Sequence, residues 1–203
     1  MMGVSDFEKS EERWQAEQSL TSYEGSSFDD APGWGNWGVP LGDIWIEMVG
    51  ILDRDALKED DRAQMFSSVV AGGDRLMGWA LAPNDLDALA ARMNLPVESQ
   101  SATDKRTGQR RTWRQVGFLE TRMEPYLPFF VGWDHPMHDE AHEMTKELGN
   151  PQVSAADVRM ELSGDPKRLS EWLGDIEAPC SIVEGPPALT AHIVSSSGDF
   201  SVS

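Results

Sequence analysis

The densest group of side chains able to bind a metal ion is a run of histidines and acids in the second half of the chain. His135, His138 and His142 fall within eight residues, together with Asp139 and Glu143. On a helix, His138 and His142 would lie one turn apart on the same face, a spacing at which two imidazoles can bind one ion. A solvated acidic face explains the same run, because few further ligands converge on it. The sequence leaves both interpretations open.

Positive charge gathers around a Thr-Gly turn in the middle of this acidic chain. The cationic residues there are Lys105, Arg106, Arg110 and Arg111. A solvated hairpin tip accounts for these four residues. Arg114 differs, since it falls in a predicted strand beside Trp113 and Gln115. If it faces a binding cup, its guanidinium could hold a substrate carboxylate as a bidentate pair.

Tryptophan is frequent, and five of the eight tryptophans fall in or beside predicted strands: Trp37, Trp45, Trp79, Trp113 and Trp133. Most are expected to lie in the core. Alternation along a strand nevertheless places Trp45 on the same face as Glu47, and Trp113 on the same face as Gln115. Aromatic walls with few polar groups are typical of small-molecule sites.

Composition narrows the possible partners. The 203 residues carry a net charge of −18, which disfavours binding to nucleic acid or to an anionic membrane surface. Cys180 is the single cysteine, so an internal disulfide is excluded and a reducing compartment fits. No apolar run is long enough to span a membrane, and residues 1–14 are too polar for a secretory signal. We therefore expect a cytoplasmic protein.

One local pattern, a strand followed by a cap and a helix, occurs three times at intervals of roughly 80 residues. The first begins at Val4, with Ser5 and Glu8 as a capping box. The second has a strand at Leu76–Leu81 and then apolar residues at helical spacing. The third has a strand at Val158–Leu162 and a helix capped by Asp165. The chain therefore contains an internal repeat.

Between the predicted helices the apolar pattern changes to a period of two, which indicates strands. The candidates are Trp37–Leu41, Ile44–Ile51, Arg111–Phe118, Pro128–Trp133, Cys180–Glu184 and Leu189–Ser195. Tight turns at Gly42-Asp43 and Thr107-Gly108 imply antiparallel pairing. The predicted class is α+β, in one domain over residues 1–203. It divides into a first module at about 1–60, a second at about 74–134, a helical connector at 135–151 and a C-terminal βαββ unit at about 152–203.

Several stretches, taken in order, resemble the glyoxalase-like domains of the vicinal oxygen chelate superfamily. They are PGWGNWGVPLGDIWIEMV, GWALAPNDLDALAARM, RRTWRQVGFLE, LPFFVGWDHP and VEGPPALTAHIVSSSGDFSV. The resemblance implies repeated βαβββ modules that form a curled mixed sheet around a cup. Only residues 1–4 precede the first helix, so we expect the first strand of the first module to be missing or truncated. The sheet edge left open there makes a homodimer plausible.

The resemblance also implies a divalent metal, with ligands on the first and last strands of each module. Glu47 matches the carboxylate of one such strand. The other matching positions hold Gly78, Trp79 and Gly132, whose side chains bind no metal, so the ligand set is incomplete and the cofactor is unknown.

The leading hypothesis is a cup that binds a small organic molecule and is lined by Trp45, Glu47, Trp79, Trp113, Gln115, Phe130 and Asp134. Catalysis would use Glu47 as a general base or metal ligand, in lyase or isomerase chemistry. The alternatives are a non-catalytic module that sequesters its ligand, as resistance proteins do, and an interaction protein with a vestigial cup.

Overall fold

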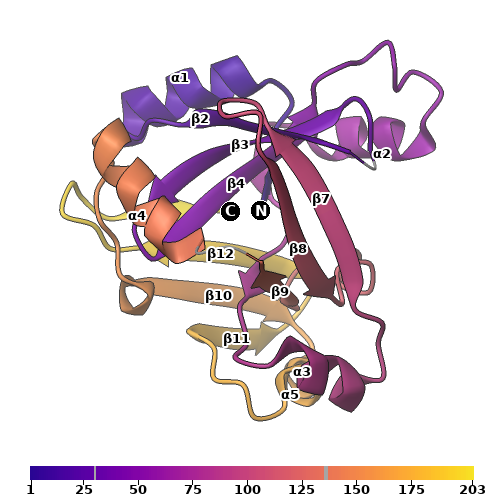
Figure 1. Cartoon of the computed structure of the whole chain (residues 1–203). Coiled ribbons are helices and arrows are strands. Elements are labelled where there is room, and N and C mark those ends of the chain that lie inside the picture. The colour runs from indigo at the N-terminus through magenta and orange to yellow at the C-terminus, as the bar shows by residue number, and fades with distance from the viewer. Residues whose placement is uncertain (30, 135–136) are drawn as a thin grey trace.

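The computed structural model describes residues 1–29, 31–134 and 137–203. These residues form two β-sheets and the helices that cover them, so the α+β class is confirmed (Figure 1). The larger sheet has nine strands in the order β5-β1-β4-β3-β2-β7-β8-β9-β6. Its strands are β1 (Met2–Gly3), β2 (Tyr23–Phe28), β3 (Trp34–Leu41), β4 (Ile44–Ile51), β5 (Arg75–Leu76), β6 (Ala80–Leu81), β7 (Glu98–Asp104), β8 (Arg110–Val116) and β9 (Phe129–Trp133).

Two βαβββ modules, as the repeat predicts, and the short strand β5 make up this sheet. The first consists of β1, α1 (Phe7–Gln18), β2, β3 and β4, and the second of β6, α3 (Leu86–Met93), β7, β8 and β9. In each module the first strand pairs in parallel with the last, and the other strands pair in antiparallel hairpins. The modules meet where β2 pairs with β7, which makes one continuous curled sheet (Figure 1).

The first strand of the first module is present but only two residues long. Strand β1 pairs with β4 on one side and with β5 on the other. The predicted open edge is therefore covered, and beyond it the Leu76 amide donates to the carbonyl of Ser203 (3.0 Å).

The prediction of one strand over Leu76–Leu81 is wrong. The segment forms two short strands, β5 and β6, because the chain passes here from one edge of the sheet to the other.

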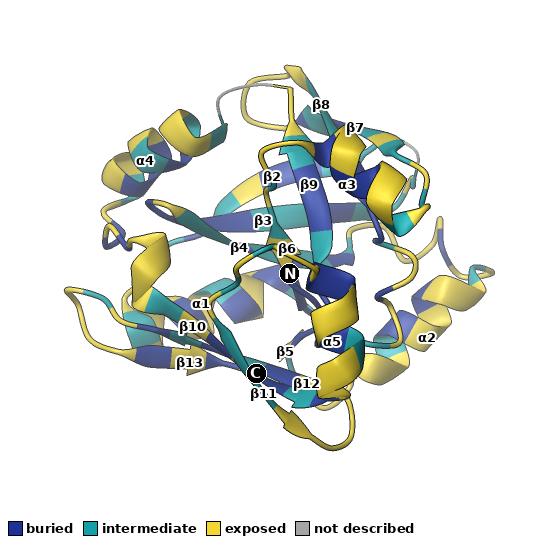
Figure 2. Cartoon of the chain, turned by 90° about the horizontal axis from the view of Figure 1, so that it is seen from below, coloured by how far each residue is buried: buried dark blue, intermediate teal, exposed yellow. Residues whose placement is uncertain are grey.

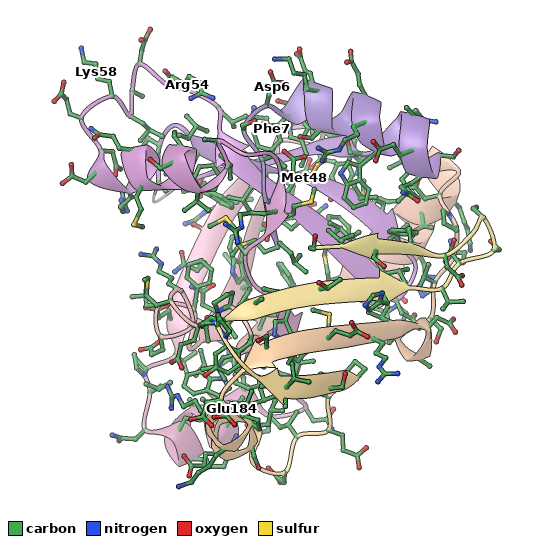
Figure 3. The ribbon with its side chains drawn as sticks, turned by 180° about the vertical axis from the view of Figure 1, so that it is seen from behind. Asp6, Phe7, Met48, Arg54, Lys58 and Glu184 are labelled. Carbon is green, nitrogen blue, oxygen red and sulfur yellow. The ribbon has the colours of Figure 1, made fainter. Side chains whose placement is uncertain are left out.

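The helix starts follow the capping pattern, with one shift. Helix α1 begins after Asp6, whose carboxylate accepts from the Lys9 amide (3.2 Å), so the predicted cap at Ser5 is one residue early. Figure 3 shows Asp6 and Phe7 at the start of α1, above Met48 of β4. Helix α5 (Pro166–Leu173) has its cap at Asp165, as predicted.

Two further α-helices and a short 3-10 helix (Ala155–Asp157) complete the helices among the described residues. Helix α4 (Met137–Leu148) fills most of the predicted connector. Helix α2 (Asp61–Val69), which no pattern in the sequence indicated, follows β4. None of the helices among the described residues is long and apolar enough to cross a membrane.

The smaller sheet contains the C-terminal unit, which has one strand more than the βαββ unit expected. Its order is β11-β10-β12-β13, formed by β10 (Val158–Gly164), β11 (Cys180–Glu184), β12 (Ala188–Ile193) and β13 (Phe200–Val202). Buried apolar side chains of both sheets form one core cluster, which includes Met48, Phe130 and Leu162. Figure 2 shows buried residues on strands of both sheets. A side-chain contact links α3 to the end of α5, because Arg92 of α3 donates to the carbonyls of Trp172 and Leu173.

Candidate functional site

The inner face of the nine-stranded sheet carries the candidate site. Along β4, Ile46 and Met48 are buried in the core, whereas Trp45, Glu47 and Val49 alternate onto the other face and are only partly buried. Helix α1 covers the core side, because a Cβ on Gly50 would meet the ring of Phe7. We call the face that carries Trp45 and Glu47, which the helices α1 and α3 leave uncovered, the inner face.

In the first module, two aromatic rings and one carboxylate define this face. Tyr23 and Trp45 meet edge to face with ring centroids 5.3 Å apart. Both rings lie over Gly38, where an added Cβ would come within 2.6 Å of each ring, so a larger residue does not fit there. Glu47 accepts a hydrogen bond from Asn36 Nδ2 at 2.6 Å, which fixes the orientation of its carboxylate.

In the second module, the same face carries a tryptophan pair. Trp113 of β8 and Trp133 of β9 pair in register, with ring centroids 5.7 Å apart. Trp133 remains 40% exposed. Gln115 is buried and donates to Glu98 at 3.1 Å. The two halves thus present aromatic surface around a small number of polar groups.

A buried ion-pair group lies between the two halves. Arg111 of β8 pairs with Asp104 of β7 at 3.1 Å and also with Glu140 of α4. Helix α4 therefore reaches over the inner face. Burial would raise the pKa of Asp104, but hydrogen bonds from Thr107 and the charge of Arg111 outweigh this effect and hold the pKa below its usual value.

Tyr23 completes this group. Burial raises the pKa of its phenol well above the ordinary value, so the ring is neutral at physiological pH. The charges of Arg111, Asp104 and Glu47 all act on this phenol, which places Tyr23 between the first and second modules. Tyr23 and Arg111 were missed as site residues, because β2 gave no strand pattern and Arg111 was assigned to a solvated hairpin tip.

Four of the predicted lining residues lie away from the inner face. Arg114 points to the opposite side of β8 and pairs with Asp87 of α3 at 2.9 Å. Phe130 is fully buried in the core. Trp79 is buried, and its indole donates to the carbonyl of Tyr126 (3.1 Å). Asp134 accepts from Thr112, a neighbour of Arg114 on that opposite side. Trp45, Glu47, Trp113 and Gln115 are the predicted residues that share the inner face.

The superfamily's metal does not fit this cup. Glu47 is the carboxylate at a matching position, and the residues that should supply the other ligands are Gly78, Trp79 and Gly132. Gly132 also faces α3, since a Cβ there would lie 3.3 Å from Leu86. One carboxylate gives too few ligands to hold a divalent ion against water.

The histidines of α4 have a carboxylate partner outside their own helix. His138 and His142 of α4 face Asp43 in the turn between β3 and β4, and these three residues form a group with metal-ligand spacing. His135 falls outside the described residues. The partner Asp43 was not predicted, because it lies far from the histidines in the sequence.

Two cavities among the described residues lie away from the inner face. One of about 300 Å³ opens between α1 and β13 and is lined by Trp14, Arg13 and Phe200. Another of about 80 Å³ lies beside α2.

The comparisons with known proteins agree with this architecture. The family model of the glyoxalase-like domain matches residues 1–176. The chain belongs to the glyoxalase-like domain family. A hypothetical protein from Staphylococcus aureus has a similar crystal structure, with a TM-score of 0.56 and 12% sequence identity over 91% of this chain and 87% of that chain. At 12% identity, the similarity shows that the two proteins share a fold and says nothing about a shared function. A comparison with curated proteins finds no match.

Proposed function

We propose that this glyoxalase-like domain binds a small organic molecule, apolar or cationic, against the inner face of its larger sheet. The supporting observation is that Trp45, Trp113 and Trp133 are left partly exposed on that face instead of being packed into the core. Aromatic side chains that remain accessible beside a few oriented polar groups are characteristic of ligand sites.

The charges around this face favour a cation over an anion. The three carboxylates of Glu47, Asp104 and Glu140 outnumber two cations, the Arg111 guanidinium, which already pairs with two of them, and the Met1 ammonium, whose charge acts on Glu47. An anionic ligand would have to compete with these pairs. A cation over an indole ring gains from the ring quadrupole, by about 0.5–2 kcal/mol.

Three probes of similar shape and different charge test the proposal: N-methylquinolinium, 2-methylnaphthalene and 2-naphthoate. Quenching of tryptophan fluorescence measures their binding. We expect saturable binding of the cationic and neutral probes, with the anion bound at least tenfold more weakly. Saturable binding by none of the probes would contradict the proposal and favour a protein-interaction role for the domain.

A matched pair of variants locates the site. Trp45→Ala removes an aromatic ring from the inner face, and Trp37→Ala removes one from the core side of the adjacent strand, where Trp37 stacks on Phe7. We expect Trp45→Ala to weaken binding about 2- to 12-fold, the equivalent of 0.5–1.5 kcal/mol for one aromatic contact. Trp37→Ala should lower stability and leave the dissociation constant unchanged. Equal effects on affinity would contradict the assignment of the inner face.

Catalysis by Glu47 is a second candidate. Asn36 holds one carboxylate oxygen, and within residues 1–29, 31–134 and 137–203 no hydrogen bond occupies the other. An oriented carboxylate with one open oxygen can accept a proton from carbon next to a carbonyl group. Exchange of such a proton with D2O, followed by NMR on a bound carbonyl compound, tests this step. Glu47→Gln should abolish the exchange and preserve binding, and exchange at the wild-type rate would exclude Glu47 as the base.

A further inference from the structure

Two histidines of α4 and one aspartate meet at the end of β3. His138 and His142 are four residues apart, and their rings stack with centroids 4.6 Å apart. Asp43 occupies the turn between β3 and β4. The Nε2 atoms of His142 and His138 lie 2.8 and 3.2 Å from Asp43 Oδ1. Both rings therefore direct the same nitrogen at one carboxylate oxygen.

Main-chain contacts fix the turn against the helix. Gly42 has a φ of +79°, and a Cβ there would lie 2.9 Å from the carbonyl of Val153. The Gly42 amide donates to the buried Thr145 hydroxyl of α4 (2.8 Å). The Asp43 amide donates to Val153, and Asp43 Oδ2 accepts from the Ala155 amide. The carboxylate is thus held in place from both sides.

Gln152 orients the imidazole of His142. Its Nε2 donates to the His142 carbonyl, so its Oε1 faces His142 Nδ1 at 2.7 Å. An amide oxygen only accepts, and Nδ1 must therefore carry the hydrogen. The lone pair of Nε2 is then left facing the Asp43 carboxylate. Two acceptors 2.8 Å apart require a positive particle between them, which is either a proton or a metal ion.

We propose that Asp43, His138 and His142 bind a divalent transition-metal ion of the zinc type. Two imidazole nitrogens and one carboxylate are a ligand set that zinc uses when solvent fills its remaining position. Imidazole also discriminates against Mg²⁺ and Ca²⁺, which prefer oxygen ligands.

The distances allow such an ion with little movement. The candidate ligand atoms all lie within 4.8 Å of one another. Metal–ligand bonds of about 2.0–2.1 Å place tetrahedral ligand atoms roughly 3.4 Å apart. The Asp43–His142 and Asp43–His138 distances of 2.8 and 3.2 Å must then lengthen by roughly 0.6 and 0.2 Å, and ligand atoms farther apart than this spacing must move closer. His138, with 66% of its side chain exposed, has the freedom to adjust.

The ion would join the β3–β4 turn to α4. Glu140 of the same helix pairs with Arg111 on the inner face, so metal binding would also stabilise the position of α4 over that face. The test of this site does not involve a ligand on the inner face.

Calorimetric titration of Zn²⁺ into protein purified without a histidine tag tests the proposal. We expect one ion per chain and no heat with Mg²⁺. Asp43→Asn and His138→Ala should each weaken binding at least tenfold. Co²⁺ in place of Zn²⁺ should give visible absorption bands of a low-coordinate site, which both variants lose.

His192→Ala is the matched control. His192 Nε2 lies 3.1 Å from a carboxylate oxygen of Glu161 on the smaller sheet, a pair with a single histidine. This variant should bind Zn²⁺ like the wild type. Absence of stoichiometric Zn²⁺ binding, or binding that Asp43→Asn and His138→Ala leave unchanged while circular dichroism shows a folded chain, would overturn the proposal.

Two further measurements separate a site from adventitious surface binding. Gln152→Leu removes the group that orients His142 and should weaken Zn²⁺ binding about 10- to 100-fold, as is usual for such supporting residues. Hydrogen exchange of the α4 amides should slow when Zn²⁺ is present. Unchanged affinity in Gln152→Leu together with unchanged exchange would show that the ion does not occupy this position.

Discussion

The substitution Thr145→Val tests how much the Thr145 hydroxyl stabilises the packing of α4 against the larger sheet. The Thr145 side chain is completely buried, and its hydroxyl donates to the Ala141 carbonyl (2.6 Å) while it accepts from the Gly42 amide (2.8 Å). Valine has nearly the same shape, so no cavity forms. The buried Gly42 amide loses its partner, which costs about 1–3 kcal/mol.

We therefore expect Thr145→Val to lower the free energy of unfolding by about 2 kcal/mol in urea titrations. In a chain of this size, that corresponds to roughly 4–8 °C in melting temperature. Thr145→Ser is the control, because it keeps the hydroxyl and loses one buried methyl group, worth about 1 kcal/mol. If Thr145→Ser destabilises the protein more than Thr145→Val does, the hydrogen bond from Gly42 is not the main contribution of Thr145 to the packing of α4.

Three further perturbations test separate parts of the structure. Gly38→Ala should destabilise the protein by about 1–3 kcal/mol and alter tryptophan fluorescence, because the new Cβ overlaps both rings of the first module; an unperturbed spectrum would count against that packing. Asp104→Asn should lower the melting temperature at pH 7 and reduce its pH dependence in acid. The folded pKa of Asp104 lies below the unfolded value near ~3.9, so its stabilisation is complete above that value and is lost as the pH falls through the folded pKa; an identical acid transition in both proteins would contradict this. Trp172→Ala should cost about 3–5 kcal/mol by chemical denaturation, because it empties a core position and removes the indole hydrogen bond to Pro128 (2.7 Å); a loss under 1 kcal/mol would show that Trp172 does not hold the C-terminal unit in place.

The sequence predicted the elements whose burial alternates or whose caps are strong. Strand β4 was assigned with its bounds as Ile44–Ile51, because one side of it is apolar and packs into the core. Helix α5 was found from Asp165, Pro166 and Gly174, which mark both its ends. In both cases the local pattern and the tertiary packing agree.

The elements that were missed have no such pattern. Strands β2 and β7 read YEGSSF and ESQSATD, with polar residues at most positions. They are strands because their main chains pair with each other and with β3 and β8. A periodicity analysis cannot detect pairing between segments that lie far apart in the chain.

The candidate site was only partly predicted, because it too depends on contacts between segments far apart in the chain. Alternation correctly grouped Trp45 with Glu47, but the side of β8 that faces inward depends on where α3 packs. Arg114 and Phe130 were therefore assigned to the wrong face, and Arg111 was left out. Asp43 joins His138 and His142 only because α4 docks on the β3–β4 turn, which no local signal encodes.

The order of strands in the larger sheet also has a kinetic consequence. The hairpins β3–β4 and β7–β8 connect residues close in sequence and need little loop closure. The two-residue strands β1 and β6, at or next to the edges of the sheet, each pair in parallel with a strand more than forty residues away, and over only two residue pairs. Folding should then proceed from the two hairpins outward, at a rate set by these distant closures. In the native protein, amide exchange should accordingly be slowest in the hairpins and fastest at the two rims of the sheet.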